Sequence, residues 1–454
     1  MSENSSPNRD SANPFLSGSI GAVFVRTSVP IILVTLVNGL LTVADAMLLG
    51  AFVGTDALSA VTLVFPFSML LVAAATMVGI GMASVLGRRL GARDLDGARQ
   101  TLAAAQGLAL AVSVLAAALF FIAGSSAVGW VTGGNARLGD MAWTFLAISF
   151  ATAPVTFLLS VQSDALRTEG RVAFMAIAGV IVTLANIALN ALFIGAWHFG
   201  VAGSAWGTAL AQLVALGVIL AYRLSGKSVL PVVGLRCERS WMEMLSLGLP
   251  RSLNFIGISL GSAAVLFALR QLELAQPEAT IAAYGVATRL MTFAFLPLMG
   301  MSLALQAIAG NNAGAGMPER AMQGLRLAVT VSAAYGVVVM ALLIGGRDVL
   351  GHLFVGEVAV VREVARIVPV YVAAYFAFGP VMMAAAYVQA LGRVRQAALL
   401  SLGRTYCFAF PFTLLLPLIW GETGVWAAAP VADLLMLVVT LLVWQGSQSK
   451  LASA

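Results

Sequence analysis

The chain has 454 residues, of which 60% are hydrophobic and only 10% are charged, against about 25% charged residues in a typical soluble domain. So few charges cannot cover the surface of a water-soluble fold of this size, and the composition therefore indicates an integral membrane protein. The net charge of +6 does not indicate nucleic-acid binding, because the arginines gather in loops between apolar stretches and no basic run alternates with aromatic residues.

The chain begins with a polar segment and continues with long apolar stretches. Residues 1–16 are polar, lack the pattern of a signal peptide and are predicted to be a disordered tail. A membrane-spanning helix needs about 20 apolar residues, and the short alternating segments of a transmembrane barrel are absent. We therefore predict an all-α membrane protein with twelve transmembrane helices near residues 28–51, 58–86, 98–124, 139–163, 172–195, 201–222, 244–269, 280–308, 321–345, 367–391, 396–419 and 424–445.

The distribution of positive charge predicts the orientation. With the N-terminus inside, 19 of the 25 Lys and Arg residues lie on the inner side, and the outer side holds the other six, Arg137, Arg270, Arg289, Arg347, Arg362 and Arg366. Loops on the cytoplasmic side of membrane proteins are rich in Lys and Arg. Both termini are therefore expected in the cytoplasm.

The two halves of the chain repeat each other. Pro30 recurs as Pro250, Gly170-Arg171-Val172 recurs as Gly392-Arg393-Val394, and Gly200-Val201 recurs as Gly424-Val425, at offsets of 220, 222 and 224 residues. Six spans followed by six spans, both starting inside, make parallel repeats, which are typical of transporters with the substrate path between the halves. We predict an N-lobe over residues 17–223, a cytoplasmic linker over 224–243, a C-lobe over 244–446 and a C-terminal tail over 447–454.

Two acidic residues, Asp45 and Asp433, lie inside predicted spans. Each is 11 residues from an outer-side acid, Asp56 or Glu422, which corresponds to roughly 16 Å along a helix. A charge at the bilayer centre costs about 3 kcal/mol, and desolvation favours the neutral form of a carboxyl. A carboxyl whose charge changes with its surroundings is suited to carry a proton.

Asp45 is expected to lie in a polar cluster in the outer half of the N-lobe. Asn38, Thr42 and Asp45 share one face of the first span, and Asn186 and Asn190 are four residues apart on the fifth. Thr208 on the sixth span lies at a similar depth. These groups either couple an ion to transport around one titrating carboxyl or act as polar contacts between helices, which contribute about 0.6 kcal/mol each. With Asp45 among them, ion coupling is the favoured interpretation.

Asp433 has fewer polar neighbours in the sequence. It follows Pro430, which loosens the helix, and its expected partner is either Arg404 on the neighbouring span or backbone amides at the kink. Structural and functional roles remain equally open for it. Met and Phe residues near Pro66, Pro297 and Phe378 suit either the lipid-facing surface and the core or an adaptable cavity for amphipathic ligands.

Enzymatic and ATP-driven functions find no support. Ser225-Gly226-Lys227-Ser228 resembles the end of a phosphate-binding loop, but Ala221 replaces the required glycine and no strand precedes it. The two histidines near span ends supply neither a catalytic base beside a nucleophile nor a metal cluster, so we expect no catalytic residues, no metal site and no cofactor. An ion gradient, or the substrate's own gradient, must then supply the energy.

The whole chain resembles the multidrug and toxic compound extrusion (MATE) family, most closely its prokaryotic branches. The motifs follow the family's order over about 420 residues: Val43-Ala44-Asp45, Asp56-Ala57-Leu58-Ser59-Ala60-Val61, Gly79-Ile80-Gly81, Leu90-Gly91-Ala92-Arg93-Asp94, Leu166-Arg167-Thr168-Glu169-Gly170-Arg171, Asn186-Ile187-Ala188-Leu189-Asn190, Gly200-Val201-Ala202-Gly203-Ser204-Ala205-Trp206, Ala282-Ala283-Tyr284-Gly285-Val286 and Gly424-Val425-Trp426.

The resemblance implies two six-helix bundles, alternating access, and export of cationic or amphipathic compounds against inward H⁺ or Na⁺. The family's N-lobe site maps onto Asp45, Asn186, Asn190 and Thr208, with Asn38, Thr42 and Asp433 as supporting polar residues. Relatives often have Asp where this chain has Asn190, and no acid lies in 244–269 or 367–391, where some relatives carry one. The chain therefore favours H⁺ as the coupling ion and leaves Na⁺ as the alternative.

The same resemblance implies the setting and the main rival. We expect a functional monomer in the bacterial inner membrane, with membrane lipid and small-molecule substrates as its partners and no nucleic acid. A lipid-linked saccharide flippase of the same superfamily (MOP) is the alternative. It typically has a strongly basic cavity, whereas only Arg289 and Arg404 are predicted to lie deep here.

Overall fold

The computed structural model describes residues 13–133, 135–236, 240–272, 276–353 and 357–452. Within these ranges the chain forms helices and no strand. The first half holds α1 (Ile20–Phe52), α2 (Thr55–Gly91), α3 (Leu95–Val131), α4 (Ala136–Ala151), α5 (Ala153–Thr168), α6 (Val172–Asn190), the π-helix η1 (Ala191–Ala196) and α7 (Gly200–Leu224). The second half holds α8 (Trp241–Arg270), α9 (Pro277–Gly314), α10 (Pro318–Gly345), α11 (Arg347–Leu350), the 3₁₀ turn η2 (Gly351–Leu353), α12 (Val358–Tyr371), α13 (Tyr375–Ala390), α14 (Val394–Leu402), the π-helix η3 (Gly403–Ala409), α15 (Phe410–Leu415), α16 (Pro417–Trp420) and α17 (Glu422–Ala452).

The number of membrane-spanning helices agrees with the prediction from the sequence. Ten helical segments among the described residues are long and apolar enough to cross a membrane, and two bent pairs, α4 with α5 and α12 with α13, bring the number to as many as 12. The bends are 50° and 52°. The predicted all-α membrane fold is confirmed, and α12 extends the tenth span beyond the predicted start at residue 367.

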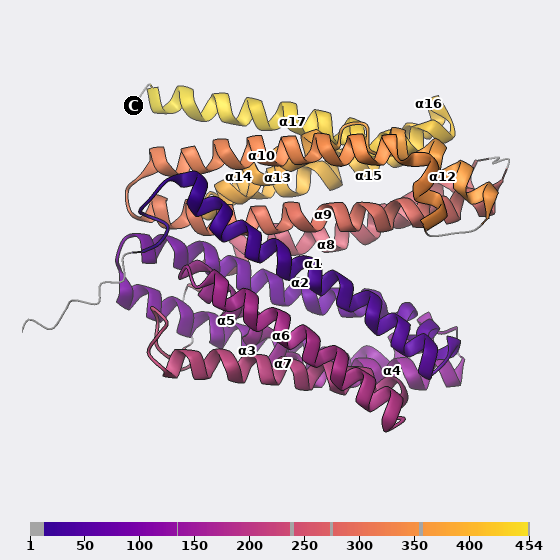
Figure 1. Cartoon of the computed structure of the whole chain (residues 1–454), viewed down its shortest axis with the longest axis horizontal. Coiled ribbons are helices and arrows are strands. Elements are labelled where there is room, and N and C mark those ends of the chain that lie inside the picture. The colour runs from indigo at the N-terminus through magenta and orange to yellow at the C-terminus, as the bar shows by residue number, and fades with distance from the viewer. Residues whose placement is uncertain (1–12, 134, 237–239, 273–275, 354–356, 453–454) are drawn as a thin grey trace, which may run out of the picture.

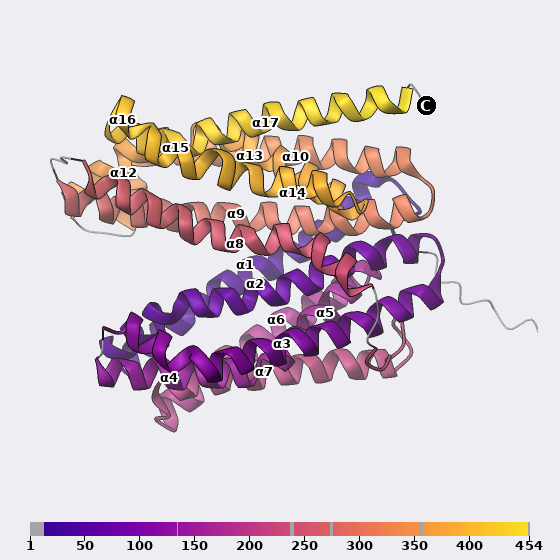
Figure 2. The same ribbon diagram turned by 180° about the vertical axis from the view of Figure 1, so that it is seen from behind.

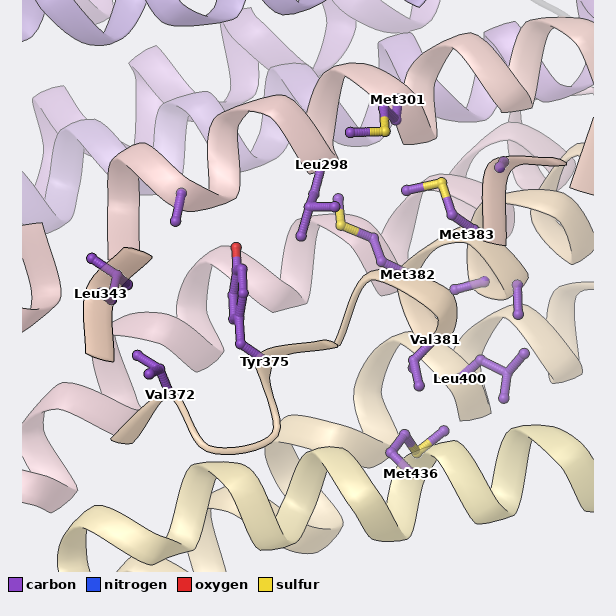
Figure 3. Packing of buried hydrophobic residues seen from close by; sticks show 14 of the residues in the cluster. Leu298, Met301, Leu343, Val372, Tyr375, Val381, Met382, Met383, Leu400 and Met436 are labelled. Atoms are coloured by element: carbon purple, nitrogen blue, oxygen red, sulfur yellow. The ribbon is translucent and has the colours of Figure 1, made fainter. Parts of the chain in front are cut away.

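The helices form two lobes, each with its own apolar core (Figures 1 and 2). Helices α1–α7 make the N-lobe, whose core lies mainly among α2, α3, α4 and α5. Helices α8–α17 make the C-lobe, whose core lies mainly among α9, α10, α12 and α13. Figure 3 shows part of the C-lobe core, where Val372 and Tyr375 reach inward from the break between α12 and α13.

The two lobes lie closest at one end of the molecule, which we call the proximal end; it holds the α2–α3 turn and the start of α8, and the opposite end, with the α1–α2 turn, is the distal end. Helix α1 still contacts α9 near the middle of both helices, where the Thr35 hydroxyl lies 3.4 Å from the Leu296 carbonyl oxygen. The ribbons of the two lobes lie closest at the proximal end and diverge toward the distal end (Figure 1). The joining helices are α2, which packs along α8 and α9, and α1, which packs along α9.

Glycines permit this close approach. A Cβ at Gly81 would overlap the carbonyl oxygen of Met244 on α8, and a Cβ at Gly248 would overlap the carbonyl oxygen of Met77 on α2. The backbones of α2 and α8 are therefore in direct contact, as at other membrane-helix crossings built on small residues.

Segments at the proximal end tie the tail and linker to the lobes. The Asn13 amide donates to Asn311 Oδ1 at 2.7 Å, and Phe15 is only 2% exposed. The predicted disorder is therefore wrong for residues 13–16, because an apolar Phe15 and a polar Asn13 find partners on α9; residues 1–12 lie outside the described chain. The linker packs on the N-lobe, where the Trp241 indole N–H donates to the Ala104 carbonyl at 2.8 Å.

Candidate functional site

The polar cluster predicted around Asp45 forms between α1 and α6. The Asn190 side-chain amide donates to Asp45 Oδ1 at 2.7 Å and to Asn186 Oδ1 at 2.9 Å. Asn190 is fully buried and Asn186 nearly so, while Asp45 is half-buried. Residues four apart stand one above the other on a helix face, so the two asparagines present one continuous polar edge to the carboxylate.

Local backbone geometry helps to place Asn190. It is the last residue of α6, and the π-helix η1 begins at the next residue. Such wide turns in membrane helices often occur at functional sites. On the other side of the amide, Gly207 of α7 leaves room for Asn190 Oδ1, which a Cβ at that position would overlap. This buried Oδ1 has no hydrogen-bond partner among the described residues.

Asn38 joins the same face through a residue that the sequence analysis missed. The Thr183 hydroxyl lies within hydrogen-bond distance of two acceptors for its one proton, Asn38 Oδ1 at 3.0 Å and the Gly179 carbonyl at 2.9 Å. The sequence does contain a signal for Thr183, because Thr183, Asn186 and Asn190 are spaced by three and four residues and therefore lie on one face of α6. A polar ladder therefore runs along α6 facing α1.

Two predicted members are less closely bound to the cluster. Thr208 is half-buried on α7, beside Gly207, and its hydroxyl has no hydrogen bond within the part of the chain that the structure describes. The side chain of Thr42 lies outside the described residues.

No fixed countercharge neutralises Asp45. Within the described ranges, none of the ion pairs involves this carboxylate, and no group of three or more His, Cys, Asp or Glu side chains is arranged to hold a metal ion. The site thus consists of one carboxylate, carboxamides and hydroxyls. Such a set can bind and release a proton or hold a monovalent cation, but it offers no nucleophile–base pair for covalent chemistry.

Asp433 takes the first of its two expected partners. Arg404 of η3 donates through Nε to Asp433 Oδ1 and through Nη2 to Asp433 Oδ2, the latter at 3.3 Å. The guanidinium also lies over the Phe378 ring, 4.6 Å from its centroid. Arg404 and Asp433 therefore form a two-pronged ion pair inside the C-lobe, and Asp433 does not join the Asp45 cluster.

The arginines differ from expectation in one further respect. Arg289, which was expected to lie deep, is on α9 with an exposed side chain, and it has no ion pair or hydrogen bond among the described residues. Arg251, which the sequence analysis counted on the inner side and did not expect to lie deep, lies ten residues into α8. Its Nη2 donates to Ser302 Oγ at 3.2 Å. The predicted span 244–269 already contained Arg251, but span length does not indicate which partner its guanidinium contacts on the neighbouring helix.

Comparison with known proteins identifies the family. The sequence model of the MatE family matches residues 30–192 and again 250–415. The chain belongs to this family of multidrug and toxic compound extrusion (MATE) transporters. The second match begins 220 residues after the first, which is the offset between Pro30 and Pro250 and agrees with the predicted duplication.

Individual MATE relatives match over nearly their whole length. The chain is 25% identical over 446 residues to an FAD transporter of Shewanella oneidensis, covering 93% of each chain. It is 24% identical over 441 residues to the probable multidrug resistance protein YoeA of Bacillus subtilis, covering 92% of this chain and 93% of the relative. It is 23% identical over 440 residues to the multidrug export protein MepA of Staphylococcus aureus, covering 95% of each.

Solved structures confirm the MATE fold. A multidrug resistance MATE transporter of the MOP superfamily, solved in an outward-facing conformation, superposes with a TM-score of 0.89 at 23% identity over 97% of this chain and 98% of that one. A MATE protein in complex with MaL6 superposes with a TM-score of 0.89 at 22% identity over 98% of this chain and 100% of that one. Since MATE proteins are transporters, the chain is a multi-pass membrane transporter and not an enzyme.

Proposed function

We propose that this MATE transporter is an antiporter that exports cationic or amphipathic small molecules in exchange for H⁺, with Asp45 as the proton-carrying group. The observation that supports it is the position of Asp45, which accepts a hydrogen bond from the buried Asn190 amide and has no ion pair with a Lys or Arg side chain among the described residues. A carboxylate that is not neutralised by a fixed cation is free to be neutralised by a proton or by a cationic substrate.

Asn190 can serve both charge states of Asp45. A carboxylate accepts only, whereas a protonated carboxyl also donates. An asparagine amide offers two N–H donors on one side and a carbonyl acceptor on the other. In the present arrangement Nδ2 faces Asp45, and the unpaired buried Oδ1 faces Gly207. Rotation of the Asn190 amide exchanges the two, so a protonated Asp45 can donate to Oδ1, and the Asn186 amide, whose Oδ1 now accepts from Nδ2, then rotates as well and donates to that oxygen.

Coupling requires only that proton and cargo favour different conformations. In the structure the lobes are closed at the proximal end and diverge at the distal end. We assign this arrangement to the outward-open state, in which Asp45 takes up a proton from outside, α1 shifts against α6 and the cargo leaves. Return to the inward-open state then releases the proton inside.

The orientation follows from charge. Arg88, Arg89, Arg93 and Arg99 all lie at or beside the proximal α2–α3 turn. Because cytoplasmic loops are enriched in such residues, we assign the proximal end, with both chain termini, to the cytoplasm, and the protein to a bacterial inner membrane. We propose that a single chain is the functional unit.

The alternatives are less well supported. Na⁺ prefers several anionic oxygen ligands, and Asp45 is the one carboxylate among the described members of the cluster, while Asn186 Oδ1 already accepts from Asn190. The named cargoes of relatives differ, from drugs to a flavin nucleotide. The cationic cargo is therefore proposed from the negative charge of Asp45, which has no ion pair among the described residues. A lipid-linked saccharide flippase remains the outcome to test by complementation of a lipid-carrier flippase mutant.

The decisive experiment is transport by purified protein in liposomes, with pH and Na⁺ gradients imposed separately and rhodamine 123 as a cationic probe. We expect an interior-acid pH gradient to drive uptake, and a Na⁺ gradient at constant pH to have no effect. Asp45→Asn should reduce the pH-driven uptake to the level of empty liposomes, because an amide cannot exchange a proton near neutral pH.

The matched control is Asp56→Asn, at the distal start of α2. This carboxylate forms an exposed ion pair with Arg137 at 3.3 Å, and such pairs contribute at most about 1 kcal/mol, so transport should be retained. Full pH-driven transport by Asp45→Asn would remove Asp45 from the mechanism, and uptake driven by Na⁺ alone would replace the proton by the alternative ion.

A further inference from the structure

A cavity in the C-lobe lies apart from the Asp45 cluster. It is lined by α8, α9, α13, α14 and η3 and is partly open. Its polar lining consists of two arginines, one asparagine, one serine and one threonine, and no acidic side chain among the described residues lines it; the residues that the argument uses are Arg251, Asn254, Phe255, Phe295, Phe378 and Arg404. A cavity in which the charged groups are all positive is unexpected in a pump for cations.

The positive charge of this cavity is only partly neutralised. Arg404 is paired with Asp433, which is not one of the lining residues. Arg251 donates to the neutral Ser302 hydroxyl, and among the described residues no carboxylate forms an ion pair with it. The nearby Arg167 is itself paired with Asp164 at 2.8 Å. A guanidinium without a carboxylate partner among the described residues, facing this cavity, favours an anion there.

The remaining walls are suited to a flat ring. Phe378 lies under the Arg404 guanidinium at 4.6 Å, and its ring centroid lies 6.0 Å from that of Phe295. Phe255 lines the cavity from α8. Met382, which Figure 3 shows beside Leu298, and Met299 also line it, and methionine side chains adapt readily to different ligand shapes. Aromatic ligands stack on such rings and on guanidinium planes.

From this combination we propose that the C-lobe cavity is a binding site for a planar aromatic anion. Arg251 and Arg404 hold the anionic group, Phe255, Phe295 and Phe378 contact the ring, and Asn254 supplies a polar contact at the edge. Asp433 neutralises Arg404 but not Arg251. The anionic group of the ligand would supply the negative charge that Arg251 lacks. A cationic ligand is disfavoured, because it would be placed beside the unpaired Arg251.

The proposal extends the proposed function to a second site with the opposite charge preference. Asp45 and its partners lie on α1 and α6 in the N-lobe, whereas all of the lining residues lie on C-lobe elements. The two sites are therefore testable independently, and equilibrium binding of an anion does not require proton coupling.

Fluorescein and rhodamine 123 provide a matched pair of probes, because they share a xanthene ring system and carry opposite charge at pH 8. Binding of each would be measured by fluorescence polarisation with the full-length protein in nanodiscs of neutral phosphatidylcholine. We expect saturable fluorescein binding that Arg251→Gln weakens by roughly tenfold or more, the usual effect of removing one charge-assisted contact. Rhodamine 123 binding should be unchanged by Arg251→Gln.

Three further variants keep the result interpretable. Arg289→Gln removes an exposed arginine outside the cavity and should leave fluorescein binding intact. Arg404→Gln alone would strand Asp433, so the pair is tested as Arg404→Gln with Asp433→Asn, which should also weaken fluorescein binding. Asp45→Asn should bind fluorescein as the wild-type protein does, so that loss of proton coupling is distinguished from loss of this site.

Three outcomes would overturn the proposal. The first is no saturable fluorescein binding. The second is binding that Arg251→Gln and Arg289→Gln weaken equally, which would indicate attraction by net charge alone. The third is displacement of fluorescein when phosphatidylglycerol replaces part of the neutral lipid, without displacement by a soluble competitor such as naphthalene-2-sulfonate; that result would assign the cavity to an anionic lipid headgroup.

Discussion

The Asn190 amide donates to the Asp45 carboxylate at 2.7 Å, across the contact between α6 and α1. Asparagine at this position leaves the cluster with one negative charge, and its side-chain carbonyl oxygen, Oδ1, is buried without a partner among the described residues. We therefore expect the choice of coupling ion to depend on the neutral Asn190 side chain as much as on the Asp45 carboxylate. Substitutions at Asn190 and at Gly207, which contacts Asn190 Oδ1, test this dependence.

Asn190→Asp should create a response to Na⁺. The new carboxylate would lie within hydrogen-bond distance of Asp45, and two adjacent carboxylates repel unless a cation or a proton lies between them. We expect a Na⁺ gradient at constant pH to drive rhodamine 123 uptake in the variant but not in the wild-type protein. The measurement is initial uptake into liposomes as a function of internal Na⁺. Asn186→Asp, one turn away on α6, shows whether any added carboxylate has this effect, and uptake without Na⁺ stimulation in Asn190→Asp would contradict the single-charge explanation.

Gly207→Ala should disturb the cluster from the opposite side. The added methyl group would overlap Asn190 Oδ1, so the amide must rotate or move away from Asp45. Overpacking of this kind costs about 1–3 kcal/mol, and we expect pH-driven uptake to fall by roughly tenfold, as expected for a loss of about 1.4 kcal/mol. Gly217→Ala on the same helix is the control, because no atom lies near its Cβ. Equal transport by the two variants would show that the position of the Asn190 amide does not matter.

Much of this arrangement was predictable from local patterns. Apolar length alone identified the spans, and spacing by three and four residues placed Asn186 and Asn190 on one face toward Asp45. Arg404 was one of two expected partners for Asp433, and the structure selects it. Helix periodicity carries this information, because the position of each of these side chains is set by its own helix and by one neighbouring helix.

The features that escaped prediction depend on tertiary structure. The break between α12 and α13 at Val372–Ala374 follows Pro369 by three residues, a signal that apolar length alone does not use. Arg251 falls inside the predicted span 244–269, but its contact with Ser302 of α9 depends on how α8 packs against α9. Thr183 was overlooked because a hydroxyl is common in membrane helices, where it often bonds its own backbone, as it also does here.

Glu169 and Arg223 form a fully buried ion pair at the proximal end of the N-lobe, 2.8 Å apart. Glu169 also accepts from the backbone N–H groups of Val229 and Leu230, so it fixes the linker to the lobe. Glu169→Gln would leave Arg223 buried without a countercharge, which costs about 3–5 kcal/mol. We expect a clearly lower unfolding midpoint in detergent, measured by intrinsic fluorescence on heating.

The control for this pair is Asp96→Asn on α3, whose ion pair with Arg99 is exposed. Removal of such a pair costs at most about 1 kcal/mol, so the midpoint should barely move. The double variant Glu169→Gln with Arg223→Met should recover part of the loss, since removal of both charges is far less costly than removal of one. A double variant no more stable than Glu169→Gln would show that the linker contacts, and not the stranded charge, account for the effect.

Closure of the lobes at the proximal end depends on contact between backbones, and Gly248→Ala should weaken it. The added Cβ would overlap the carbonyl oxygen of Met77, and a backbone carbonyl inside α2 cannot rotate away as a side chain can. The two lobes must therefore separate at this point, which disfavours the state closed at the proximal end. With Cys237 and Cys407 replaced by serine, because Cys407 is exposed and would also react, we expect spin labels at Arg93→Cys and Met317→Cys, one on each lobe at the proximal end, to report a longer mean distance by electron paramagnetic resonance. Gly261→Ala, on the same helix but in open space, should leave the distance distribution of the labelled protein unchanged. An unchanged distribution in Gly248→Ala would mean that the α2–α8 contact does not set the conformational equilibrium, and closure would then have to depend on the α1–α9 contact instead.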